Sequence, residues 1–326
     1  MLALLLLAFI KHSHDFQSLL FDIQRQLLYQ YPSAMSPSPY VVPIVDSTAV
    51  FKADIFKGKV LFCTGGGSGI CRGMTEGMMR HGAKAAIVGR KLDRLTQAAK
   101  EMSQATGSEC IPAQGDVRSP ADLKAAVAMT IAKFGRIDYV ICGAAGNFLV
   151  PISGMSENAF KTVMEIDTIG TFNTIKATIE HVRKSKGAYI HVSATLHYQG
   201  TPFQAHVSAA KAGVDALSAV LAVEEGPNGV RSNVIAPGPI DGTEGMERLS
   251  PKGDVGEQNG YPAGRMGVVG DIANATIFLF SDAAAYITGQ VLPVDGGTMH
   301  MQGTFFPYPR SVIDPQSVKH LIKPRL

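Results

Sequence analysis

The chain has 326 residues, of which 46% are hydrophobic and 17% charged, and its net charge is +3. This length suits one large domain, and the composition excludes a disordered chain. The positive charge is weak and scattered along the sequence, so it does not indicate a nucleic-acid-binding surface. The four cysteines form no CxxC pair, so they predict buried, reduced thiols rather than disulfides, and no metal site is expected.

The chain begins with the apolar run MLALLLLAFI, which is too short for a membrane span of about 20 residues and has no basic residue before its apolar part. A second methionine, Met35, opens a natural lead-in to the first strand. We interpret residues 1–34 as a gene-model extension, with a targeting segment as the alternative, and residues 35–57 as a lead-in arm. No stable membrane insertion is expected.

From Lys59 onward, short β-branched runs alternate with longer amphipathic stretches. Expected strands cover 60–64, 85–89, 110–117, 138–144, 188–194, 231–238 and 287–297. Expected helices cover 70–81, a stretch after 89, 121–134, 157–183 and the segment around Lys211. This alternation predicts an α/β fold, a Rossmann-like doubly wound parallel sheet in three layers, as a single domain over 58–298. Residues 299–326 lose periodicity, which indicates a C-terminal arm.

A glycine-rich stretch, TGGGSGIC at 64–71, lies between the first strand and the first helix. Glycines let the backbone approach a pyrophosphate, and the helix N-terminus supplies unpaired N–H groups. The predicted phosphate-binding residues are Gly65, Gly66, Gly67, Ser68, Gly69 and Ile70.

The residue after the second strand selects the cofactor. An NAD site places an acidic residue there, but this chain has Arg90 followed by Lys91, which suits a 2′-phosphate and predicts NADP(H). Asp116 and Val117, after the third strand, are expected at the edge of the adenine ring.

These motifs, in this order, resemble the short-chain dehydrogenase/reductase family over nearly all of 58–298. TGGGSGI matches its TGxxxGxG loop except that Cys71 replaces the last glycine, GAAG (143–146) matches its NNAG-type loop, and PGPIDGT (237–243) matches its nicotinamide-side loop. The resemblance implies cofactor contacts from Ala144, Gly146, Pro237, Gly238, Ile240, Thr243 and Lys211.

The family's Ser–Tyr–Lys–Asn set is largely replaced. Lys211 is retained, Val207 stands at the tyrosine position, and Asp167 stands at the asparagine position. The serine position falls on Ala194, with Ser193 one residue away and therefore on the opposite face of its strand.

The loss of the tyrosine argues against carbonyl reduction, because an alkoxide must be protonated by an acid beside its oxygen and valine is no acid. His206 and Ser208 flank the position but are expected to point elsewhere on the helix. A conjugated thioester differs, since hydride addition gives a dienolate that needs its proton at carbon. Asp167 is the candidate donor; burial raises its pKa and Lys211 lowers it, which favours delivery through a water over a permanently protonated carboxyl.

AAGNF (144–148), FKTVMEIDT (160–168), SAAKAG (208–213) and APGPIDGTEG (236–245) narrow the resemblance to 2,4-dienoyl-CoA reductases of the peroxisomal branch, including the fungal enzymes. It implies NADPH-dependent reduction of 2,4-dienoyl-CoA to 3-enoyl-CoA, an auxiliary step of β-oxidation, with Asp167 and Lys211 catalytic. It also implies a homodimer or homotetramer paired through helices 157–183 and 203–226. The implied substrate contacts are Arg118, Asn147, Phe148, Ser156, Asn158 and Arg248.

The chain ends in KPRL, and Arg325 and Leu326 fit a peroxisomal import signal whereas Pro324 replaces its usual small residue. Together with the resemblance, this predicts the peroxisomal matrix and an import receptor as partner, with the cytoplasm as alternative.

Two other functions stay open on the sequence. One is a 3-ketoacyl or steroid-type carbonyl reductase with a displaced acid, for which His197 and Tyr198 are the nearby candidates. The other is a non-catalytic NADP(H)-binding sensor.

Overall fold

The computed structural model describes residues 41–249, 261–300 and 314–321. The expectations for residues 1–34 and for the Pro-Arg-Leu ending at 324–326 lie outside these residues. Within them, a seven-stranded sheet has the order β3-β2-β1-β4-β5-β6-β7, and every strand pair is parallel. The predicted doubly wound α/β fold is confirmed.

The strands are β1 (Val60–Thr64), β2 (Lys84–Gly89), β3 (Cys110–Gln114), β4 (Tyr139–Cys142), β5 (Ala188–Val192), β6 (Arg231–Pro237) and β7 (Val291–Val294). The helices that cover the sheet are α3 (Gly69–Arg80), α4 (Leu92–Thr106), α5 (Pro120–Phe134), α7 (Gly170–Ser185), α9 (Ala205–Glu225) and α11 (Val269–Phe280). The helices at its carboxyl edge are α6 (Glu157–Met164), α8 (Leu196–Gln199) and α10 (Glu244–Leu249).

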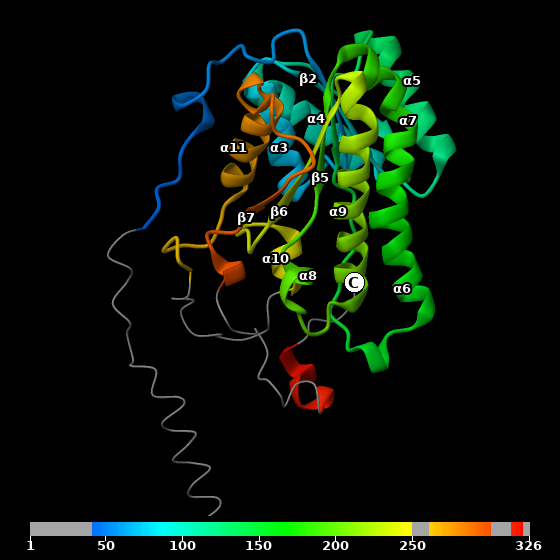
Figure 1. Cartoon of the computed structure of the whole chain (residues 1–326), viewed down its shortest axis with the longest axis vertical. Coiled ribbons are helices and arrows are strands. Elements are labelled where there is room, and N and C mark those ends of the chain that lie inside the picture. The colour runs from blue at the N-terminus through cyan, green and yellow to red at the C-terminus, as the bar shows by residue number, and fades with distance from the viewer. Residues whose placement is uncertain (1–40, 250–260, 301–313, 322–326) are drawn as a thin grey trace, which may run out of the picture. The chain divides into compact units, whose positions relative to one another are not determined.

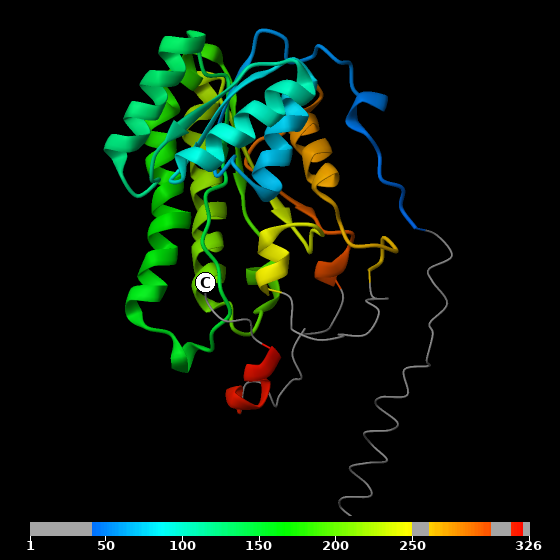
Figure 2. The same cartoon turned by 180° about the vertical axis from the view of Figure 1, so that it is seen from behind.

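Helices cover both faces of the sheet, as Figures 1 and 2 show. One hydrophobic core joins the sheet to α3, α4 and α11, and a second joins it to α5, α7 and α9. The central strands are buried on both faces, which explains why a run such as VLFCT in β1 is nearly all apolar. All four cysteines are free and buried, as predicted.

The chain order reverses between β1 and β4, which lie side by side at the centre of the sheet. Ligands of open parallel sheets bind outside the carboxyl ends of the strands at such a switch point. The loops that follow β1 and β4 meet there, because the hydroxyl of Thr64 accepts a hydrogen bond from the backbone N–H of Gly143 at 3.1 Å. The fold therefore brings the TGGGSGI and GAAG stretches together.

The helical pattern differs from the prediction in two places. The single helix expected over 157–183 is instead α6, a five-residue π-helical turn (Glu165–Ile169) and α7. Helix α11 was not predicted, although it packs along α3 and is nearly all apolar. Helix α9 is long and apolar enough to span a membrane by composition, but its buried residues pack against the second core.

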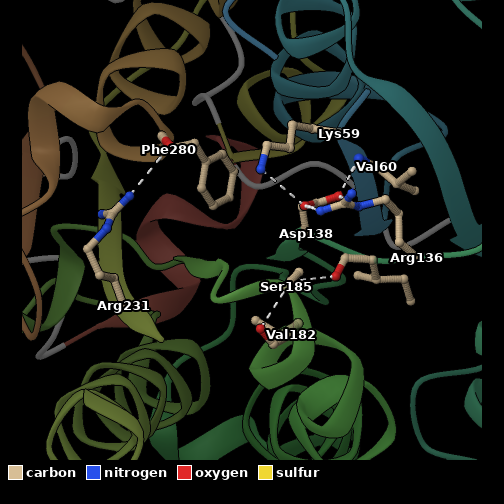
Figure 3. A network of polar contacts seen from close by, with 9 residues as sticks. Lys59, Val60, Arg136, Asp138, Val182, Ser185, Arg231 and Phe280 are labelled. Carbon is tan, nitrogen blue, oxygen red and sulfur yellow. Dashed lines mark hydrogen bonds and ion pairs between the residues drawn. The ribbon is translucent and has the colours of Figure 1, made fainter. Parts of the chain in front are cut away.

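A buried carboxylate ties the amino ends of β1 and β4 (Figure 3). Asp138 is 1% exposed; it accepts a hydrogen bond from the backbone N–H of Val60 at 2.9 Å and pairs with Arg136 at 2.5 Å and Lys59 at 3.5 Å. This network lies at the end of the sheet opposite to the switch point, so its role is structural.

We expect Asp138→Ala to lower the free energy of unfolding by about 2–3 kcal/mol, because the buried N–H of Val60 loses its acceptor. Asp138→Asn keeps an acceptor and should lose less. Urea unfolding of both variants measures this difference, and equal stability of Asp138→Ala and the unmodified protein would contradict it.

Candidate active site

The glycine-rich loop connects β1 to α3. Gly65 has φ +77°, and a Cβ there would lie 2.9 Å from the carbonyl oxygen of Gly143, so only glycine fits. Ser68, the N-cap of α3, makes no side-chain capping bond, which leaves the first backbone N–H groups of α3 to an anion. Both features fit the pyrophosphate of a dinucleotide.

Cys71 stands where the motif has its last glycine. Its thiol donates to the carbonyl oxygen of Gly143 at 3.6 Å, and a Cβ on Gly143 would lie 2.1 Å from that sulfur. Because Gly143 has no side chain, there is room for the thiol of Cys71, and α3 can still lie close to the loop after β4. Gly66 is held as tightly, since a Cβ there would lie 2.5 Å from the side chain of Ile87.

Arg90 directly follows β2, and its side chain is exposed. Among the residues that the structure describes it takes part in no ion pair, whereas Arg94, one turn on, pairs with Glu244 of α10. The charge of Arg90 still reaches Asp116: the pKa of Asp116 is lowered, mainly by hydrogen bonds from Arg118 and to a smaller degree by Arg90. Arg90 is thus an exposed cation directly after β2 that has no ion-pair partner in the described part of the chain.

Asp116 and Arg118 were assigned to different ligands, and the structure brings them into contact. Arg118 Nη2 lies 2.6 Å from Asp116 Oδ2, and its Nε donates to Oδ1 at 3.0 Å. The two side chains line a cavity of about 410 Å³ together with Ser119, Glu165 and Ile169. Val117 is buried beside them.

Asp167 and Lys211 form a buried pair. Their side chains are almost fully enclosed, and Lys211 Nζ lies 3.5 Å from Asp167 Oδ2. Lys211 also donates to the carbonyl oxygen of Val192 at 2.9 Å, and Asp167 Oδ1 accepts the backbone N–H of Gly146 at 2.8 Å. Asp167 Oδ2 has no hydrogen-bond partner among the described residues. A buried carboxylate oxygen left this way is a place for a water or a substrate atom.

Burial raises the pKa of Asp167, and the opposing charge of Lys211 and the hydrogen bond from Gly146 reduce that rise without cancelling it. The pattern is typical of acid–base groups, whose pKa values are moved toward the working pH by desolvation and a charged partner. The π-helical turn at Glu165–Ile169 carries this side chain, and such turns occur frequently at functional sites.

Val207, one helical turn before Lys211, is 3% exposed. It packs in an apolar cluster with Val163 and Ala210, against which Phe148, Met164 and Leu196 lie. The position at which the reductase family has its tyrosine is therefore occupied by an apolar side chain in apolar surroundings. Ser193 is buried just after β5 and donates its backbone N–H to Ile235, while Ala194 is half-buried.

His206 was expected to point away from the site, and the structure shows what its side chain contacts. The imidazole is fully buried, and its ring centroid lies 4.2 Å from that of Phe148, a predicted substrate contact. The contact between His206 and Phe148 could not be predicted from the sequence, because the position of a residue on a helix does not tell which loop packs against it. The two signals in the sequence were an aromatic residue in the loop after β4 and a histidine next to Val207.

The other predicted substrate residues lie near the carboxyl edge of the sheet. The side-chain oxygen of Asn147 accepts the N–H of Phe148 at 2.7 Å, and Ser156 caps α6 by accepting the N–H of Ala159 at 3.2 Å. Asn158 is exposed in the first turn of α6. Arg248 pairs with Glu244 on α10 at 3.3 Å.

The loop after β6 is shaped by close contacts. A Cβ on Gly238 would lie 2.5 Å from Asp295 Cβ, and the buried Ile240 pairs with Gly267. The hydroxyl of Thr243 is the acceptor for the N–H of Met246 at the start of α10. Pro237, which ends β6, is buried, and Ala144 and Gly146 lie half-buried in the facing loop after β4.

Tyr198 and His197 were the candidates for a displaced acid, and both are engaged elsewhere. Tyr198 donates to Asp215 Oδ2 at 2.7 Å, and His197 Nε2 lies 2.7 Å from the same oxygen. Burial and the bond to Asp215 raise the pKa of Tyr198, whereas a catalytic phenol needs a lowered one.

Comparison with known proteins agrees with this geometry. A family model described as Enoyl-(Acyl carrier protein) reductase matches residues 65–299. The chain is 50% identical over 276 residues to the peroxisomal 2,4-dienoyl-CoA reductase SPS19 of Saccharomyces cerevisiae, a match that covers 82% of this chain and 94% of that protein. It is 47% identical to the peroxisomal 2,4-dienoyl-CoA reductase of Danio rerio, over 77% of this chain and 84% of that one.

Solved structures give the same result. A short chain dehydrogenase from Bacillus anthracis is 36% identical with a TM-score of 0.68, over 77% of this chain and all of that one. Levodione reductase is 29% identical with a TM-score of 0.71, over 76% of this chain and all of that one. The fold and site thus define an oxidoreductase that uses a nicotinamide cofactor. The chain belongs to the short-chain dehydrogenase/reductase family.

Proposed function

We propose that the chain is a peroxisomal 2,4-dienoyl-CoA reductase that uses NADPH and forms 3-enoyl-CoA in the β-oxidation of unsaturated fatty acids. The reductase activity, the acyl-CoA substrate and the peroxisomal location follow from relatives of that name at 45–50% identity. The observation that carries the chemistry is the buried Asp167–Lys211 pair beside Val207, where a carbonyl reductase would have its phenol.

When bound, NADPH would supply the hydride that adds to the far end of the diene. The charge then spreads to the thioester oxygen, which hydrogen-bond donors stabilise without giving up a proton. Asn147, in the loop after β4, is the proposed side-chain donor to the thioester. The ammonium of Lys211, which the carbonyl of Val192 orients, would hold the nicotinamide ribose and keep a positive charge beside the reacting atoms.

The proton goes to the carbon next to the thioester. Asp167 Oδ1 is held by the N–H of Gly146, which aims Oδ2 toward Lys211 and leaves it as the atom that passes the proton, directly or through one water. Its raised pKa makes proton donation easier to achieve near neutral pH. The apolar surroundings of Val207 suit a hydrocarbon diene.

The remaining cofactor and substrate contacts are proposals from the same placement. Arg90 binds the 2′-phosphate, and residues 65–70, Asp116, Val117 and the loops after β4 and β6 bind the rest of NADP(H). Arg118 and Arg248 pair with phosphates of CoA, for which each would exchange its present carboxylate partner. Phe148, Ser156 and Asn158 complete the substrate site.

We also propose a homodimer or homotetramer. Helices α7 and α9 expose large apolar side chains, including Phe172, Val220 and Val223, the last of them 78% exposed. Apolar side chains on adjacent helices are typical of an interface between subunits. An import receptor that binds the Pro-Arg-Leu ending completes the proposed partners.

The direct test follows NADPH oxidation with 2,4-decadienoyl-CoA and, separately, with a 3-ketoacyl-CoA. We expect turnover of the dienoyl thioester and little or none of the ketoacyl thioester. Fast ketone reduction without dienoyl turnover would support the carbonyl-reductase alternative. Cofactor binding without turnover of either substrate would support a sensor.

A further inference from the structure

A short C-terminal 3₁₀ helix, η7 (Pro315–Leu321), packs on the body of the protein. Val318 is 2% exposed; it forms an apolar cluster with Phe203, and Leu149 and Leu321 pack against the two. In Figures 1 and 2 this segment, drawn in red, lies beyond the carboxyl ends of the strands. Helix η7 therefore packs at the side of the sheet that carries the candidate active site.

The two loops beneath η7 are joined to each other. The N–H of Val150 donates to the carbonyl oxygen of Phe203 at 3.2 Å, which links the loop after β4 to the loop before α9. Phe203 has φ +66°, a left-handed backbone conformation that residues other than glycine rarely adopt. Such backbone strain persists where surrounding contacts impose it, and it concentrates at functional sites. Here it turns the ring of Phe203 into the cluster with Val318.

Both loops lead directly to the reacting centre. Leu149 follows Phe148, and Phe203 precedes His206 in the segment that opens α9, while the rings of Phe148 and His206 lie 4.2 Å apart. Phe148 also packs on the cluster around Val207. The buried cluster around Val207 and the buried cluster around Val318 are thus joined by adjacent residues of the two loops. The arginines proposed for the CoA phosphates belong to neither cluster.

We propose that η7 forms the outer wall of the acyl-chain site and that Val318 determines the preference for chains that extend beyond the diene. The inference rests on the proposed function, since it assigns the part of the substrate that this surface holds. Short dienoyl thioesters end near Val207, whereas longer chains reach the loops that Val318 supports. Each methylene held there contributes about fourfold to binding.

The test compares 2,4-hexadienoyl-CoA with 2,4-decadienoyl-CoA on the full-length protein. We expect Val318→Ala to lower kcat/KM for the decadienoyl thioester about tenfold, through KM, and to change that for the hexadienoyl thioester less than twofold. Val318→Ile, which keeps an apolar β-branched side chain and adds one methylene, should retain the unmodified profile. Lys319→Ala, an exposed neighbour on the same segment, is the matched control and should change neither value.

Binding of the unreactive decanoyl-CoA and hexanoyl-CoA gives a second readout that does not need turnover. We expect Val318→Ala to weaken the binding of decanoyl-CoA and to leave the binding of hexanoyl-CoA unchanged. Equal losses for both chain lengths, in kinetics or binding, would mean that Val318 only supports the fold, and an unchanged chain-length ratio would overturn the inference as well. Failure of the proposed function looks different, because the unmodified protein would then oxidise NADPH with neither dienoyl thioester.

Discussion

Asp167→Asn is expected to reduce kcat for 2,4-dienoyl-CoA about 10²- to 10⁴-fold, the range typical of general acid–base catalysis. Asparagine keeps the shape and an oxygen for the N–H of Gly146, so the loop after β4 stays in place, but the amide cannot deliver a proton to carbon. NADPH affinity should change little. Stopped-flow NADPH oxidation together with fluorescence titration of NADPH separates the two quantities.

The matched control is Asp215→Asn, which removes the carboxylate that His197 and Tyr198 share. We expect near-normal dienoyl turnover from this variant. If Asp215→Asn were inactive and Asp167→Asn active, the proton donor would be the displaced group and the assignment of Asp167 would fail.

The pH dependence of kcat gives an independent check on Asp167. Burial raises its folded-state pKa, so the protonated, donating form persists to higher pH than for an ordinary aspartate. We expect kcat to fall as pH rises through that raised pKa and to be maintained below it. The same descending limb should be missing from the residual activity of Asp167→Asn.

Arg90→Gln is expected to weaken NADPH about 10- to 100-fold, because a charge-assisted contact to the 2′-phosphate contributes about 1.5–3 kcal/mol. NADH has no 2′-phosphate, so its KM should stay nearly the same and the preference for NADPH should shrink by the same factor. Steady-state kinetics with both cofactors and one dienoyl-CoA measures the change.

Lys100→Gln removes an exposed cation farther along α4 and serves as the control for net charge. It should leave both KM values unchanged. If Arg90→Gln weakened the binding of NADPH and of NADH equally, Arg90 would support the conformation of the loop rather than bind the 2′-phosphate. The proposed NADP(H) specificity would then lose its main support.

The relation between sequence and site differs from residue to residue. The phosphate loop was predicted because its glycines, strand and helix lie within one short segment whose conformation is local. Val207 and Lys211 were recognised through the resemblance to the reductase family, whose tyrosine stands four residues before its lysine. The cation at Arg90 was predicted because it directly follows a strand.

Contacts between distant segments were less predictable. The π-helical turn at Asp167 was expected as continuous helix, because no residue type there requires the wider turn. His206 was assigned away from the site since its partner, Phe148, belongs to a different loop. Arg118 and Asp116 were given separate ligands, yet the fold pairs them. The docking of Val318 on Phe203 had no signal in an arm without periodicity.

The sequence by itself determined the parallel α/β fold, the dinucleotide loop and the absence of a phenol four residues before Lys211, because these depend on residue order and on periodic burial. Only the tertiary structure decided that Asp167 is buried beside Lys211, that His206 lies against Phe148, and that Val318 of η7 packs on Phe203. The physical reason is that the raised pKa of Asp167 and the apolar contact between Val318 and Phe203 both depend on packing between segments far apart in the chain. A local sequence pattern does not show which distant segments pack together.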